Sequence, residues 1–151
     1  MQFKTEVQKQ FEKAGWFESR NTENKLIQKI SNYIDLPNHL KDFLKSYCDL
    51  IIEDCKPSKS EVINTLDTTI KFIKNNSEKN LPFSDVLYKV GYYYPDHYFV
   101  YTDSNGAVFL AGDRYFKISD TFTEGIEKII EDNWTNYFEW NPETNQWVDE
   151  Y

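Results

Sequence analysis

The sequence predicts an α+β fold in which N-terminal helices pack on a central antiparallel β-sheet arranged as a meander. Three observations lead to this fold class. Apolar side chains recur at helical spacing over residues 3–47, short aromatic and β-branched runs alternate with turns over residues 91–118, and another amphipathic segment covers residues 121–134. Helices kept apart from a run of strands are typical of α+β proteins.

Three helices are predicted before residue 48. Residues 3–14 carry an apolar stripe that stops at Gly15, a residue suited to the end of a helix. A second helix is expected between Thr22 and Ile34, and a third after Pro37, because proline fits the first helical turn and disfavours helix in the residue before it. The third helix buries Leu40, Phe43, Leu44 and Tyr47.

The middle of the chain gives weaker patterns. Residues 50–52 form a short apolar run, which predicts a first strand. Residues 62–66 fit either a strand or the start of a helix. We favour a short strand followed by a helix from Asp67 to Lys74, because aspartate is a good helix N-cap.

The meander is the clearest pattern. Tyr98–Thr102 and Ala107–Leu110 flank the turn residues 103–106, and a second turn at 112–113 leads to a third run at Tyr115–Ile118. The aromatic run at residues 90–94 precedes the meander. After the meander we expect a helix capped by Ser119 or Thr123, and then a final hairpin over residues 137–148. We expect one domain over residues 1–151, with a short C-terminal extension at 135–151.

Charge and aromatic side chains are unevenly distributed. Residues 1–80 contain 13 Lys and Arg against 12 Asp and Glu, a balance of +1, whereas residues 81–151 contain 4 against 13, a balance of −9. The second part also carries 18 of the 26 aromatic residues. Such a surface repels nucleic acid and attracts a basic protein. Bases could stack on the tyrosines, but almost no Lys or Arg lies beside them in the sequence.

The sequence predicts a cytoplasmic protein without a membrane segment. No stretch approaches ~20 consecutive apolar residues, and the charged N-terminus lacks the apolar core of a signal peptide. Cys48 and Cys55 are therefore expected to be reduced thiols. Together with His39 and His97 they do not show the spacing of metal ligands.

No residue pattern indicates catalysis. His39 is expected on a solvent-exposed helix face and His97 in a turn, and Cys48 is interpreted as a packing residue. The turn at 103–106 lacks the further ligands of a calcium loop. A glycosidase would need two carboxylates facing each other across a sugar, and the many acidic residues suit a solvated surface equally well. We predict no catalytic residue, no cofactor and no metal.

Several short motifs, in order, resemble the third subgroup of the SUKH superfamily of immunity proteins. Ala14-Gly15-Trp16-Phe17 with Arg20 is similar to the opening "GW…R" motif. Leu36-Pro37 and the apolar face after it are similar to the superfamily's "LP..l..FL..y" helix. Further similarity follows in residues 87–112 and 129–134. The sequence departs from the pattern at Asp49, where glycines are usual, after Asn64, where Asp-Pro is expected, and in the tail from Tyr137.

This resemblance implies a non-enzymatic SUKH-like α+β domain that binds a cognate bacterial toxin and blocks it. The toxins are often nucleases, and a basic nuclease would suit an acidic inhibitor. The alternatives are a regulatory interaction scaffold or, less well supported, a carbohydrate-binding protein or hydrolase. We expect the partner-binding surface to use those side chains that are exposed among Tyr92, Tyr93, Tyr94, Asp96, Tyr98, Asp103, Asp113, Trp140 and Trp147.

Overall fold

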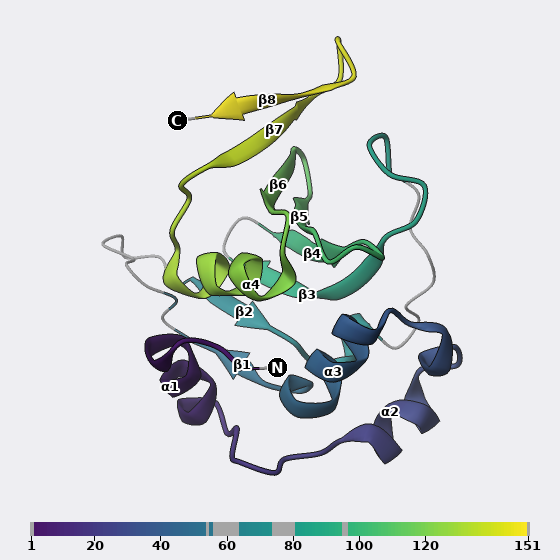
Figure 1. The fold of residues 1–151 in the computed structure, drawn as a ribbon, viewed down its shortest axis with the longest axis vertical. Coiled ribbons are helices and arrows are strands. Elements are labelled where there is room, and N and C mark those ends of the chain that lie inside the picture. Colours follow the sequence, from purple (N-terminus) through teal and green to yellow (C-terminus); the bar gives the residue numbers. More distant parts are fainter. Residues whose placement is uncertain (1, 54, 56–63, 74–80, 95–96, 151) are drawn as a thin grey trace.

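The computed structural model describes residues 2–53, 55, 64–73, 81–94 and 97–150 (Figure 1). Its α-helices are α1 (Thr5–Lys13), α2 (Glu23–Lys29), α3 (Asn38–Tyr47) and α4 (Phe122–Glu131). Two short 3-10 helices are η1 (Tyr33–Asp35) and η2 (Ile70–Phe72). The strands are β1 (Ile51–Ile52), β2 (Thr65–Asp67), β3 (Tyr88–Tyr94), β4 (Tyr98–Thr102), β5 (Val108–Ala111), β6 (Tyr115–Ser119), β7 (Tyr137–Asn141) and β8 (Gln146–Glu150).

All eight strands belong to one antiparallel sheet in which spatial order follows sequence order. Each strand therefore pairs with its neighbour along the chain, as the meander pattern predicts. The hairpin β7–β8 continues the same sheet through the pairs Phe116–Glu139 and Lys117–Phe138. Gly91 allows β2 to approach β3, because a Cβ atom there would lie 2.6 Å from the carbonyl oxygen of Asp67.

The helices and alternate strand residues enclose one large apolar core. α1 contributes Val7 and Phe11, α3 contributes Phe43 and Tyr47, and the sheet contributes residues such as Val100. α4 lies across the middle of the sheet in Figure 1. Gly125 makes this close contact sterically permissible, since an added Cβ would come within 2.4 Å of a Val108 side-chain carbon. The predicted α+β arrangement is thus confirmed.

Two predicted helices differ from those observed. The helix expected from Asp67 is absent, because Thr65–Asp67 is strand β2, and only the short η2 follows at Ile70–Phe72. The favoured strand at 62–66 is thus shifted, and its residues 62 and 63 lie outside the described part. α2 ends at Lys29 and is continued only by η1, and the hydroxyl of Thr22 donates to carbonyls of α3 rather than capping α2.

The last helix also begins and ends elsewhere than predicted. Thr121, rather than Ser119 or Thr123, is the residue at the N-cap position of α4. The helix ends at Glu131, where Asp132 adopts a left-handed conformation, so Trp134 lies beyond it. Left-handed residues of this kind commonly terminate helices.

Candidate partner-binding surface

The face of the sheet turned away from the α-helices carries a band of aromatic rings, which we call the aromatic face. Cross-strand partners share a face in an antiparallel sheet, and Tyr92–Phe99, Tyr101–Phe109 and Trp140–Trp147 are such pairs. No α-helical residue belongs to its apolar cluster, which is separate from the main core. The aromatic face consists of Phe72, Phe83, Tyr92, Phe99, Tyr101, Phe109, Tyr115, Phe138, Trp140 and Trp147.

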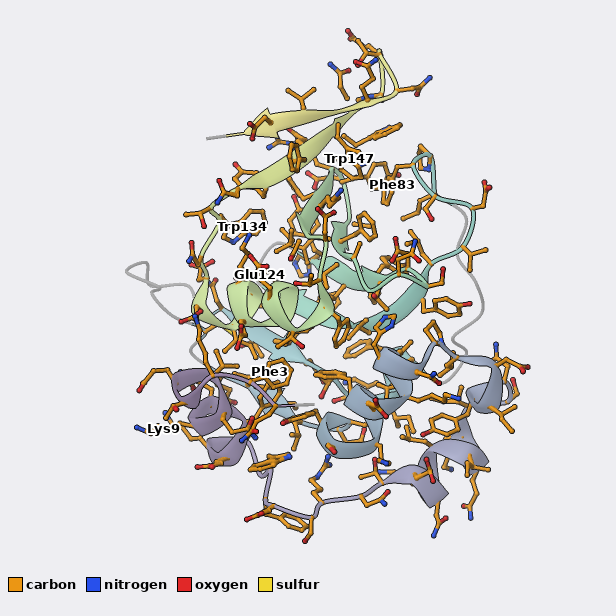
Figure 2. The ribbon with its side chains drawn as sticks, viewed as in Figure 1. Phe3, Lys9, Phe83, Glu124, Trp134 and Trp147 are labelled. Carbon is orange, nitrogen blue, oxygen red and sulfur yellow. The ribbon has the colours of Figure 1, made fainter. Side chains whose placement is uncertain are left out.

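Phe83 joins the terminal hairpin to the middle of this face. Its ring centroid lies 5.0 Å from that of Phe109, 5.8 Å from that of Trp140 and 4.8 Å from that of Trp147. Figure 2 shows Phe83 and Trp147 next to each other beneath the β7–β8 hairpin. The loop segment before β3 thus attaches the hairpin to β5 through ring contacts. Phe83 was not among the predicted site residues, since it lies in a segment without periodicity.

Several predicted contact residues are accessible on or beside this face. Tyr92, Trp140 and Trp147 are half-buried, and Tyr94 is 44% exposed. The indole Nε1 of Trp140 is buried and has no hydrogen-bond partner among the described residues. Asp113 is exposed on the turn between β5 and β6. These side chains combine apolar area with polar atoms, as the anchors of protein interfaces do.

Two predicted contact residues are buried instead. Tyr93 is 2% exposed and donates a hydrogen bond from its hydroxyl to Asp132 at 3.0 Å, and burial raises its pKa. Tyr98 is 7% exposed, and its hydroxyl donates to Asp113 at 3.0 Å. Both rings belong to the main core, because the alternation of the strands turns them toward the helices. They are therefore removed from the candidate surface.

The acidic residues of the turns have different roles. The Oδ1 atom of Asp103 accepts hydrogen bonds from the backbone N–H groups of Asn105 and Ala107, at 3.0 and 2.9 Å. This carboxylate builds the β4–β5 turn, as aspartate commonly does. Asp96 lies outside the described residues.

Three lysines lie on the aromatic face. The sequence suggested otherwise, because almost no Lys or Arg stands beside the tyrosines along the chain. Lys89 Nζ lies 4.0 Å from the ring centroid of Phe99, Lys71 Nζ 4.9 Å from that of Phe72, and Lys117 Nζ 5.7 Å from that of Phe138. These are cation–π distances. The three lysines come from η2, β3 and β6, so only the folded chain places them on the same face as the rings. The aromatic face is therefore not uniformly acidic.

The histidines and cysteines are placed as structural groups. His39 is half-buried rather than solvent-exposed; its Nε2 lies 3.0 Å from Thr102 Oγ1, and burial lowers its pKa. The Nδ1 of His97 contacts the hydroxyl of Tyr92. Cys48 is a free, buried thiol whose pKa is raised to about 12, chiefly by burial. Such a thiol is protonated at neutral pH and is a poor nucleophile.

Within the part of the chain that the structure describes, no three His, Cys, Asp or Glu side chains gather in a way that could hold a metal ion. None of the helices described has the length and hydrophobicity of a membrane-spanning segment.

A second apolar surface lies between α2, η1 and α3. A cleft of about 590 Å³ is lined by Ile27, Ile30, Tyr33 and Ile34 together with charged residues of both helices. Ile27 and Ile34, which both belong to the segment predicted as the second helix, are exposed. Ile27 lies within α2 on its solvent side, next to the buried Leu26, whereas Ile34 lies in η1, after the α-helix has ended at Lys29.

The motif residues at the N-terminus stabilise the end of α3. The ring of Trp16 stacks on that of Tyr47, with ring centroids 5.9 Å apart. The guanidinium of Arg20 donates two hydrogen bonds, from Nη1 to the carbonyl oxygen of Ser46 at 2.6 Å and from Nη2 to that of Cys48 at 2.5 Å. Asp49, in the place of the usual glycines, has a φ of 62°. Aspartate tolerates this left-handed conformation better than most residues, which explains the substitution.

Comparison with known proteins identifies the family of this chain. Residues 3–132, which are 130 of the 151, match the sequence model of the family described as SUKH-3 immunity protein. No curated protein and no solved structure shows a significant match. The matched part contains α1 to α4 and strands β1 to β6, whereas β7 and β8 lie beyond it. The chain belongs to the SUKH-3 immunity protein family.

Proposed function

We propose that this immunity protein binds the toxin encoded beside it in the cytoplasm and blocks it without catalysis, as a single domain. We further propose that the toxin is a basic nuclease domain. Beyond the family itself, the observation that carries this proposal is the accessible part of the aromatic face, where the half-buried Tyr92, Trp140 and Trp147 lie in one sheet with the acidic hairpin and the turn that carries the exposed Asp113.

The physical argument combines two contributions to binding. Aromatic side chains at the centre of an interface supply most of the binding free energy, and carboxylates around them increase the association rate with a basic partner. Nucleases need Lys and Arg to bind phosphates, so their substrate-binding surfaces complement a net charge of −8. Contact at such a surface would exclude nucleic acid by occupying its site.

The first experiment tests the function in cells. The neighbouring reading frame is expressed from an inducible promoter with or without this chain. Expression of the neighbour alone should stop growth, and co-expression of this chain should restore it. Growth arrest that persists in the presence of folded immunity protein would refute the proposed function.

The second experiment tests the surface with purified proteins. Tyr94→Ala removes an exposed ring beside the aromatic face and should weaken toxin binding by about 2 kcal/mol. Asp113→Lys should slow association and make the rate less sensitive to salt. The matched controls Phe17→Ala and Glu12→Lys alter exposed residues near α1 and should leave both constants unchanged. Equal effects of variants and controls would exclude this surface.

A further inference from the structure

Strand β8 is an open edge of the sheet. It is the last strand in the spatial order, and within the described residues it pairs only with β7. In an antiparallel pair, alternate residues of an edge strand turn their backbone N–H and C=O groups away from the neighbouring strand. Figure 1 shows this edge at the end of the molecule opposite α1 and α2, with no helix across it.

Apart from its acidic residues, this edge lacks the usual protection against pairing with another chain. Residues Gln146–Glu150 include neither proline nor lysine, and their five register pairs with β7 continue without a bulge. Val148 in the middle of the strand is 40% exposed. The opposite edge, β1, has only two residues and contacts α1. Proteins generally block a long open edge unless they use it.

The hairpin is also held in place before any partner arrives. The Trp147 ring lies 5.9 Å from that of Phe109 and 4.8 Å from that of Phe83, and Trp140 packs at 5.2 Å from Trp147. Arg114 forms an ion pair with Glu139 on β7. An edge that is ordered in the free protein avoids the entropic cost of ordering it on binding.

The charge of this region identifies the chemistry of the partner. Lys128 is the last basic residue of the chain, and residues 129–151 contain six Asp and Glu. Glu139 is paired with Arg114, whereas Glu143 and Asp149 are exposed. A second copy of the hairpin would bring acidic strands together, which is unfavourable. A strand that carries Lys or Arg complements this edge.

We propose that an extended, basic segment of the toxin pairs with β8 and becomes the ninth strand of the sheet. The inference rests on the proposed function, since it names the contact by which the toxin is held. Backbone hydrogen bonds to β8 supply affinity, and side chains beside Val148 and Asp149 supply selectivity. Because β7 and β8 lie beyond the residues that match the family, this contact is added to the shared part of the fold.

Amide hydrogen exchange with the toxin domain from the neighbouring reading frame tests the pairing directly. We expect the outward-facing amides of β8 to exchange at least about tenfold more slowly in the complex, while a contact made only by side chains of the aromatic face would leave them unchanged. Val148→Lys places a like charge opposite a basic strand and should weaken binding at least about tenfold. Glu12→Lys, which makes an exposed charge change on α1, is the control.

The outcomes separate the inference from the proposed function. Suppose that the chain rescues growth and binds the toxin tightly, but the exchange rates of the β8 amides do not change, or Val148→Lys binds the toxin as tightly as the control variant. Either result would overturn strand addition and leave the immunity function standing. Absence of any toxin binding would overturn both. A dimer of the free protein that Val148→Lys dissociates would show that a second copy occupies the edge, and this too would overturn the inference. Circular dichroism of each variant confirms that it is folded.

Discussion

Replacement of Phe83 by alanine should detach the terminal hairpin from the rest of the sheet. The ring of Phe83 contacts four others, those of Phe109, Tyr115, Trp140 and Trp147. Truncation of a fully buried phenylalanine costs about 3–5 kcal/mol. Phe83 is half-buried, so we expect a loss of about 2 kcal/mol in the free energy of unfolding. For a chain of this size that loss lowers the Tm by about 4–8 °C.

Thermal unfolding, intrinsic tryptophan fluorescence and amide exchange measure this effect. The emission of Trp140 and Trp147 should shift to longer wavelength, and β8 amides should exchange faster than those of β4. Phe17→Ala is the matched control, because Phe17 is 59% exposed and its loss should change stability by less than about 0.5 kcal/mol. A Tm for Phe83→Ala equal to that of the control, with unchanged exchange in β8, would contradict the role given to this ring.

Two further predictions concern the buried Cys48 thiol and the half-buried Asp49 carboxyl. The pKa of the Cys48 thiol is raised to about 12, so little of the reactive thiolate is present at about pH 8. In the folded protein this thiol should therefore react with iodoacetamide at least about 100-fold more slowly than in the protein unfolded by urea. Equal rates in the two states would contradict its burial. Burial by itself would raise the pKa of the Asp49 carboxyl. Hydrogen bonds from Lys25 and from the Ile70 N–H lower this pKa, as do the positive charges of Lys25 and Arg20. The net effect is a pKa below the ordinary aspartate value of 3.8. Such a carboxyl stabilises the fold above its unfolded pKa, and this contribution is lost as pH falls through the lower folded value. Asp49→Asn should therefore reduce the free energy of unfolding near pH 7 more than near pH 3, which urea titrations measure; an equal loss would disprove the linkage.

Local patterns were sufficient to predict most elements. The stripe in residues 3–14 formed α1, Pro37 preceded α3, and the turns at 103–106 and 112–113 separated β4, β5 and β6. These signals depend on residues close in sequence, so they survive folding. The prediction failed at Asp67, where pairing with Tyr92 of β3 forms a strand and overrides the capping preference of aspartate.

The sequence by itself determined the family, the meander, the terminal hairpin and the acidity of the second half. Only the tertiary structure decided which aromatic rings are accessible. Both faces of β3 and β4 are aromatic, so alternation alone could not distinguish Tyr92 from Tyr93, and the helices that cover one face settle it. Long-range packing likewise placed Phe83 under the hairpin and left β8 as an open edge, because these relations join segments that no local pattern connects.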